Sequence, residues 1–246
     1  MTKIYVVGIG PGSEDELTPK AKNALLSSDY IIGYTAYINI IKGWFPQKQF
    51  INTGMTGEVK RCEMALKKAK EGCTISLVSS GDSGIYGMAG LMLEIANQED
   101  NPVPVDIVPG ITAASAAAAV LGAPLMHDFS VISLSDCLTP WEVIYKRIQS
   151  AVDSDFIICF YNPRSRSRKE YIAIARDELL KKRKNITPVG IVWNAGRQGE
   201  KSVITNLDEM LNFDIDMFSM VIVGNSQTYT KNGKIITPRG YDLTEG

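Results

Sequence analysis

Short runs of β-branched and aliphatic residues alternate with longer amphipathic stretches along almost the whole chain, and this alternation constrains the fold most. The runs have the length of strands, and the stretches between them repeat apolar residues at the spacing of one helix face. The order predicts an α/β fold. We expect strands at 4–8, 30–33, 74–79, 103–108, 129–134, 156–161, 188–193 and 220–224, and helices at 19–27, 59–71, 91–97, 140–152, 168–184 and 207–213.

The alternation loosens once, at Gly122-Ala123-Pro124, near the middle of the 246 residues. A chain of this length suits one large domain or two small ones. We therefore expect two α/β domains, 1–124 and 125–246. The uncharged stretch 107–126 reaches membrane-spanning length, but its glycines, prolines and alanines are weak drivers of insertion. It predicts a buried helix and no membrane partner.

Composition excludes several classes of protein. Lys and Arg number 26 against 27 Asp and Glu, so the chain is not an overall polycationic nucleic-acid binder. Four widely spaced cysteines without Cys-x-x-Cys predict neither a disulfide framework nor a zinc or iron–sulfur site, and suit a reducing cytoplasm. A single histidine, His127, excludes a multi-histidine metal site. The cations at 181–184 end an expected helix, where they complement its dipole.

Three glycine-rich segments, 8–13, 79–87 and 108–114, each follow an expected strand. Ligands of open α/β sheets bind outside the carboxyl ends of strands, so the three together favour a ligand site. The first departs from a dinucleotide fingerprint, because Ser13 stands where the third glycine belongs and Pro11 removes a backbone donor. A nicotinamide-dependent oxidoreductase would rest on this loop alone. Tight turns that pack helix on strand are the plainer alternative.

Arginines gather in expected loops. Arg164, Arg166 and Arg168 alternate after the strand 156–161, and Arg197 and Arg239 stand in Gly- and Pro-containing segments. Their forked donors suit carboxylates or phosphates. A solvated turn or an RNA-binding module are the alternatives, although the interleaved aromatics of single-strand RNA binding are missing. We expect a compact polyanionic ligand and no nucleic acid.

Together these segments resemble the tetrapyrrole methylase family, the S-adenosylmethionine-dependent enzymes of corrin and sirohaem synthesis. The resemblance covers about 4–241, and one departure is Ser83, where many relatives have proline. The second half is most similar to the precorrin-3B C-17 methyltransferase branch. The shared segments are Val7-Gly8-Ile9-Gly10-Pro11-Gly12, Ser80-Gly81-Asp82-Ser83-Gly84-Ile85-Tyr86, Val108-Pro109-Gly110-Ile111-Thr112-Ala113-Ala114, Leu134-Ser135-Asp136, Phe160-Tyr161-Asn162-Pro163-Arg164-Ser165-Arg166-Ser167-Arg168, Val223-Gly224-Asn225-Ser226 and Thr237-Pro238-Arg239-Gly240-Tyr241.

The resemblance implies two α/β domains with S-adenosylmethionine in the cleft between them, S-adenosylhomocysteine as product, a homodimer and no metal. It implies methyl transfer to C-17 of precorrin-3B or cobalt-factor III, with ring contraction, in cobalamin biosynthesis. The nearest alternative is a family methyltransferase that acts on another corrin position, a ribosomal RNA ribose or the diphthamide precursor.

The resemblance also assigns residues to roles. Cofactor positions fall on Pro11, Gly81, Asp82, Ile85, Thr112, Ala113, Asn162 and Gly196. Substrate positions, for a tetrapyrrole with carboxylate arms, are Gly10, Gly12, Arg164, Arg166, Arg168, Arg197 and Arg239. Candidates for proton transfer during ring contraction are Asp82, His127, Asp136 and Tyr161.

Overall fold

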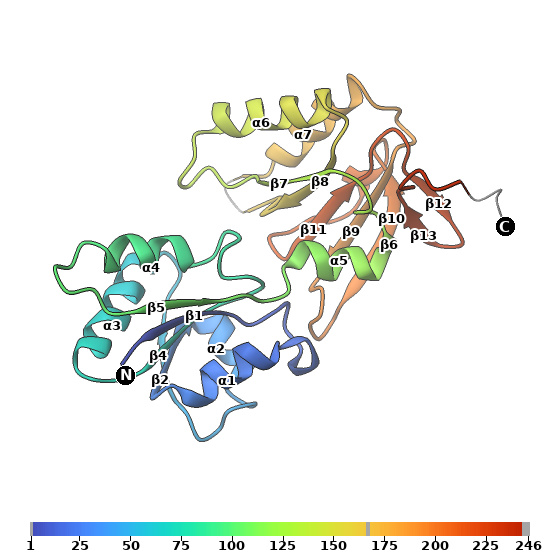
Figure 1. Cartoon of the computed structure of the whole chain (residues 1–246). Helices are drawn as coiled ribbons and strands as arrows, with labels where there is room; N and C mark the ends of the chain where they lie inside the picture. The colour runs from blue at the N-terminus through green and yellow to red at the C-terminus, as the bar shows by residue number, and fades with distance from the viewer. Residues whose placement is uncertain (1, 166–167, 243–246) are drawn as a thin grey trace. The chain divides into compact units, whose positions relative to one another are not determined.

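A computed structural model describes residues 2–165 and 168–242 (Figure 1). The chain divides into two compact units, Met1–Ala113 (unit 1) and Ala114–Gly246 (unit 2). The division falls after the first residue of the helix α5 (Ala113–Leu121) rather than at its end. At its end Leu121 packs so tightly on Gly190 that a Cβ added there would lie 2.2 Å from the leucine Cδ1. The domain boundary at 124 stays a prediction.

Unit 1 is a five-stranded parallel sheet with helices on both faces (Figure 1). The strand order is β3-β2-β4-β1-β5. The strands are β1 (Ile4–Gly8), β2 (Tyr30–Tyr34), β3 (Gln49–Thr53), β4 (Ile75–Ser79) and β5 (Val105–Val108). The helices are α1 (Pro19–Ser27), α2 (Thr35–Ile41), α3 (Glu58–Lys70) and α4 (Ala89–Ala96), with a 3-10 turn, η1 (Glu14–Glu16).

The central strand β4 shows how the sequence builds this sandwich. All five of its residues are buried, because helices cover both faces of a parallel sheet. Ile75 and Leu77 pack with α3 and α4 on one face, and Val78 packs with α1 and α2 on the other. The two hydrophobic clusters of unit 1 therefore follow the alternation of side chains along the strands.

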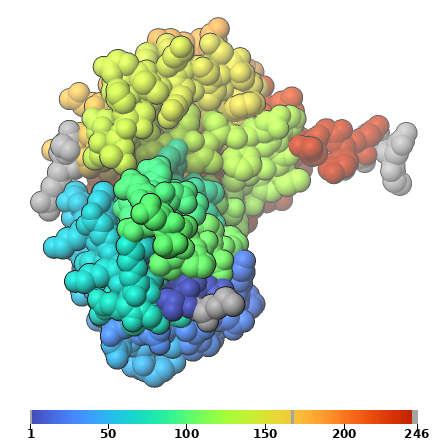
Figure 2. Space-filling view, turned by 60° about the vertical axis from the view of Figure 1, so that its left-hand side comes forward, coloured from blue at the N-terminus to red at the C-terminus, as the bar shows by residue number. Residues whose placement is uncertain are grey.

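Unit 2 contains a mixed five-stranded sheet of order β10-β9-β11-β8-β7, in which α6 and α7 pack on one face. The strands are β7 (Phe129–Ser133), β8 (Ile157–Tyr161), β9 (Pro188–Trp193), β10 (Lys201–Asn206) and β11 (Ser219–Val223). The helices are α6 (Trp141–Asp153) and α7 (Tyr171–Leu180), with a 3-10 turn, η2 (Met210–Asn212). A small sheet joins β6 (Gly122–Ala123), β12 (Tyr229–Lys231) and β13 (Lys234–Ile236), and the red C-terminal residues project beyond it (Figures 1 and 2).

Strand direction gathers three loops of unit 2 at one edge. β7 and β8 are parallel, and both β8 and β9 pair antiparallel with β11. β7, β8 and β9 therefore run in the same direction, and their carboxyl ends share an edge of the sheet.

The predicted α/β class is confirmed, and each expected strand is present with bounds that differ by at most two residues. The helix expected at 207–213 is wrong: only η2 forms there. The helix expected at 168–184 is shorter, and α2, β3, β10 and the small sheet were not predicted from the sequence. Within the described ranges 2–165 and 168–242, no helix is long and apolar enough to cross a membrane.

The cysteines differ sharply in environment, which predicts their reactivity. Burial raises the pKa of Cys62 and of Cys159 to about 12, whereas Cys137 is exposed. Because the thiolate is the reactive form, we expect iodoacetamide at pH 8 to label Cys137 in the native protein and to label Cys62 and Cys159 only after unfolding. Peptide mass spectrometry measures this, with Cys137→Ser as control. Equal labelling rates at Cys137 and Cys159 would contradict the packing of β8.

Candidate functional site

The loops after β1 and β4 are joined by a reciprocal pair of backbone hydrogen bonds. The N–H of Gly10 donates to the carbonyl of Gly81 at 3.1 Å, and the N–H of Gly81 donates to the carbonyl of Gly10 at 2.7 Å. β1 lies between β4 and β5, so the three predicted glycine loops leave the same edge of unit 1 as neighbours. The structure thus brings together, in these three loops and at the start of α5, the predicted residues Gly10, Pro11, Gly12, Gly81, Asp82, Ile85, Thr112 and Ala113.

The glycines allow the three loops to pack on one another. A Cβ on Gly8 would lie 2.6 Å from the carbonyl oxygen of Gly81, and a Cβ on Gly110 would lie 2.2 Å from the same atom. Both distances are far below van der Waals contact. Gly81 itself has a φ of +67°, a conformation that favours glycine. The close approach that these glycines permit is therefore backbone to backbone.

The Asp82 carboxylate links the loop after β4 to the loop after β5 through hydrogen bonds. Its Oδ1 accepts the N–H of Gly84 at 2.8 Å, and its Oδ2 accepts the N–H of Gly110 at 3.0 Å. The neighbouring Ser83 is buried, and its hydroxyl donates to the carbonyl of Val108 at 3.3 Å. A serine at this position thus supplies a further link between the loops after β4 and β5. The geometry gives the Asp82 carboxylate a structural task in addition to the acid–base task predicted for it.

Replacing Asp82 by asparagine tests that structural task. In Asp82→Asn an amide NH₂ faces one of the two backbone N–H groups, so we expect the free energy of unfolding to fall by about 1–3 kcal/mol. Urea denaturation measures it. The control is Asp106→Asn, which removes only the exposed pair with Lys3 at 2.8 Å and should change stability by less than about 1 kcal/mol. Equal losses of unfolding free energy in the two variants would contradict the structural role of the Asp82 hydrogen bonds.

Unit 2 gathers a second group of predicted residues at the carboxyl edge of β7, β8 and β9. The amide Nδ2 of Asn162 donates to the hydroxyl of Ser133 at 2.9 Å, and the hydroxyl of Tyr161 accepts the N–H of Ala114 at 3.0 Å. Asn162 and Asn194, which directly follow β8 and β9, have φ values of 49° and 52°. Asparagine tolerates this left-handed conformation better than most residues, and it turns the chain sharply at both strand ends.

The turn after β9 completes that edge. Gly196 has a φ of +68°, and its N–H donates to Oε2 of Glu200 at 2.7 Å. The backbone N–H of Arg197 donates to the carbonyl of Asn194 at 2.8 Å. Gly196 and Arg197 therefore lie in a tight turn that leaves the same sheet edge as Tyr161 and Asn162.

The arginines of the loop after β8 have different surroundings. Arg164 lies 3.7 Å from Asp214 with its side chain 37% exposed, whereas the side chain of Arg168 is only 12% exposed. Arg168 donates to the carbonyl of Leu134 at 3.0 Å, and its Nε lies 3.4 Å from Oδ1 of Asp136. Arg168 thus ties the loops after β7 and β8. Arg166 lies outside the described residues.

Asp136 connects this tie to α7. Its Oδ2 accepts the hydroxyl of Tyr171 at 2.8 Å, and the ring of Tyr171 stacks on Trp141 with centroids 3.8 Å apart. The hydrogen bond to the Asp136 carboxylate raises the pKa of Tyr171 above its ordinary value, because it stabilises the protonated phenol. Tyr171 and Ser133 were not predicted as site residues, because an aromatic on a helix face and a serine at a strand end are both typical of ordinary packing.

His127 and Arg239 lie elsewhere in unit 2. His127 precedes β7, where its Nδ1 accepts the N–H of Asp128 at 2.9 Å. Arg239 donates to the carbonyl of Met126 at 3.4 Å. Asp136 follows the opposite end of β7, so the structure does not place His127 with Asp136 and Tyr161. The four candidates for proton transfer therefore do not form one cluster, and Asp82 belongs to unit 1.

Comparison with known proteins identifies the family. The sequence pattern of the tetrapyrrole (corrin/porphyrin) methylases matches residues 3–211, most of the chain. This chain is a member of the tetrapyrrole methylase family. A Salmonella typhimurium protein named "Probable cobalt-factor III C(17)-methyltransferase" is 51% identical over 240 residues, covering 98% of this chain and 100% of that protein.

Two further tetrapyrrole methylase comparisons agree. The Priestia megaterium "Cobalt-factor III methyltransferase" is 48% identical over 97% of this chain, which spans only 45% of that longer protein. The crystal structure of the methyltransferase CobJ superposes with a TM-score of 0.90 at 34% identity, covering 97% of this chain and 100% of that one. The α/β architecture of the family is therefore the architecture of this chain.

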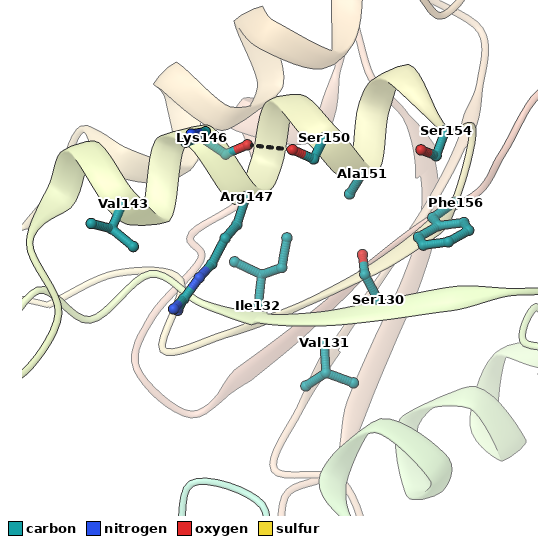
Figure 3. A pocket seen from close by; sticks show the side chains of 10 residues that line it. All are labelled: Ser130, Val131, Ile132, Val143, Lys146, Arg147, Ser150, Ala151, Ser154 and Phe156. Atoms are coloured by element: carbon teal, nitrogen blue, oxygen red, sulfur yellow. Dashed lines mark hydrogen bonds between the residues drawn. The ribbon is translucent and has the colours of Figure 1, made fainter.

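This tetrapyrrole methylase also has a surface groove outside the predicted positions (Figure 3). It encloses about 490 Å³ between α6 and β7 and includes Lys146, Arg147 and Phe156. The Ser130 hydroxyl lies in it without a hydrogen-bond partner among the described residues. None of the residues that the sequence predicted for the site lines this groove.

Proposed function

We propose that this chain transfers a methyl group from S-adenosylmethionine to C-17 of cobalt-factor III, with ring contraction, in cobalamin biosynthesis. The observation that carries the proposal is the 51% identity with the Salmonella protein of that name over the full length of that protein. We further propose that the enzyme works in the cytoplasm as a homodimer, which the family resemblance favours.

The loops of unit 1 suit a nucleoside-like methyl donor. The three segments 8–13, 79–87 and 108–114 contain one charged residue, Asp82. Its carboxylate oxygens already accept backbone N–H groups. Ile85 is 38% exposed and offers an apolar contact beside the exposed backbone of Gly84 and Gly87. S-adenosylmethionine brings an already activated methyl group. The task of the protein is then alignment and exclusion of water, which together supply up to roughly 7–11 kcal/mol of a barrier.

The arginines of unit 2 suit the carboxylate arms of a tetrapyrrole. We propose that Arg164, Arg166 and Arg197 bind carboxylates directly, while Arg168 acts mainly by holding the loops after β7 and β8 in place. This division follows from the low exposure of Arg168 and its bonds to Leu134 and Asp136. Arg239 contacts the segment before β7 and would serve a different part of the ligand.

Under this proposal, few side chains transfer protons during ring contraction. Tyr161 lies at the carboxyl edge of β8, and Asp136 is held there by Arg168 and Tyr171. We propose that these two are the candidates within unit 2 and that the protein mainly positions the reactive macrocycle. If Asp136→Asn abolished turnover while both ligands still bound, positioning alone would be refuted.

The test is anaerobic mass spectrometry of the tetrapyrrole after incubation with methyl-labelled S-adenosylmethionine. Cobalt-factor III and metal-free precorrin-3B are run in parallel, with the protein omitted as control. We expect one labelled methyl on cobalt-factor III and faster reaction with it than with precorrin-3B. Faster reaction of precorrin-3B would assign the chain to the metal-free substrate. No label on either substrate, with S-adenosylmethionine shown to bind, would reject the proposed C-17 activity.

A further inference from the structure

A buried guanidinium without a carboxylate partner lies at the same edge of unit 1 as the glycine loops. Arg61, in the first turn of α3, is 3% exposed. Its Nε donates to the Thr53 hydroxyl at 2.7 Å, its Nη2 donates to the Gly54 carbonyl at 3.1 Å, and its Nη1 lies 3.6 Å from the sulfur of Met88. Across the described part of the chain, no carboxylate oxygen lies within 4.0 Å of it.

Burying a cation is unfavourable unless hydrogen bonds or ion pairs compensate for its lost hydration. Here it joins two loops that are not neighbours in the sheet. Thr53 ends β3 and Gly54 opens the loop that follows it, whereas Met88 ends the glycine-rich loop after β4. β2 separates β3 from β4, so one side chain spans the carboxyl ends of three strands.

Both joined loops carry a large exposed side chain. Met55 is 58% exposed, and Tyr86 is 57% exposed. Each stands beside a backbone held in the left-handed region, at Thr56 with φ 61° and at Tyr86 itself with φ 52°. Exposed apolar side chains on two loops at the same edge of a sheet suit a surface that receives an apolar ligand face. A flat macrocycle with charged arms at its rim presents such a face.

We propose that Arg61 is a positioning residue for the tetrapyrrole. It fixes the loop 54–57 relative to the loop 81–88, so that Met55 and Tyr86 together contact one face of the ring. This inference rests on the proposed function for the identity of the ligand. It assigns Arg61 an effect on tetrapyrrole binding, not on the methyl donor and not on the chemical step.

The test separates binding of the two ligands. Absorbance titration with cobalt-factor III and calorimetric titration with S-adenosylhomocysteine are made on the wild type and on Arg61→Met. We expect the Kd of the tetrapyrrole to rise roughly tenfold or more, with that of S-adenosylhomocysteine changed less than about threefold. In turnover, KM for the tetrapyrrole should rise while kcat stays within about threefold. Equal rises of both Kd values, or an unchanged tetrapyrrole Kd, would overturn the proposal.

A second variant keeps the proposal testable if Arg61→Met fails to fold. Met55→Ala alters only an exposed side chain and should raise the tetrapyrrole Kd by roughly threefold to tenfold. Its matched control is Leu26→Ala, which is 42% exposed near the end of α1 and should leave that Kd unchanged. An unchanged tetrapyrrole Kd in Met55→Ala would overturn the proposal that Met55 contacts the ring. A wild type that binds the tetrapyrrole without methylating it rejects the proposed function alone, since the binding arms still test Arg61.

Discussion

Gly110→Ala is expected to lower the free energy of unfolding by roughly 2–6 kcal/mol. The added methyl group would lie 2.2 Å from the carbonyl oxygen of Gly81 and 2.6 Å from that of Gly8. Both neighbours are backbone, which cannot rotate aside as a side chain can. Overpacking of this kind costs about 1–3 kcal/mol, and loss of the hydrogen bond from Gly110 to Asp82 adds about 1–3 kcal/mol.

Urea denaturation followed by circular dichroism measures this loss. The matched control is Gly90→Ala in α4, where an added Cβ meets no heavy atom within 4 Å. Alanine is the better helix former, so this control should be neutral or more stable by up to about 1 kcal/mol. Hydrogen exchange should locate the damage of Gly110→Ala in the three glycine loops. Stability equal to that of Gly90→Ala would contradict the packing of the loops after β1, β4 and β5.

Arg183→Met is expected to lower the free energy of unfolding by about 2–6 kcal/mol. The run 181–184 looks like a set of solvated helix-end cations, but the Arg183 side chain is 2% exposed. Its Nη1 donates to the Gly224 carbonyl at 2.6 Å and its Nη2 donates to the Phe156 carbonyl, with Asp155 at 3.9 Å. Burial lowers the pKa of Arg183 to about 10. Methionine fills the space of the stem but leaves two carbonyls without a donor, each worth about 1–3 kcal/mol.

The adjacent cation provides the comparison. Lys182 is 64% exposed and lies 3.6 Å from Asp153, so Lys182→Met should change stability by less than about 1 kcal/mol. Thermal unfolding of the two variants and the wild type measures the difference. If Arg183→Met melted at the same temperature as Lys182→Met, the buried hydrogen bonds from Arg183 to Phe156, just before β8, and to Gly224, just after β11, would contribute no stability and the prediction would fail.

The predictable part of the fold is the buried part. Strands such as β4 and β11 are fully buried and mostly apolar, because they lie in the middle of their sheets. The edge strands β3 and β10 mix polar and apolar residues, and their sequences resemble loops. These two segments are strands because they pair with β2 and β9. A local sequence pattern does not predict such pairing.

The candidate site divides in the same way. The three glycine loops could be predicted, because glycine after a buried strand is a local signal and strand ends share an edge. The contacts that fasten them could not. The bond from Gly110 to Asp82 depends on β5 lying two strands from β4, and the contact of Arg61 with Met88 depends on β2 lying between β3 and β4. Such contacts follow from strand order, which periodicity alone leaves open.

The placement of β1 has a consequence for synthesis on the ribosome. β1 is made before the other strands of unit 1, yet Ile4 pairs with Ile75 on one side and with Val105 on the other. At about 5–20 residues per second, the apolar first strand waits roughly 5–20 s for its second neighbour. During that interval its edges are open to pairing with other nascent chains. A circular permutant that begins between α4 and β5 would shorten the wait for that neighbour, and its yield of folded protein in translation would report how much this delay matters.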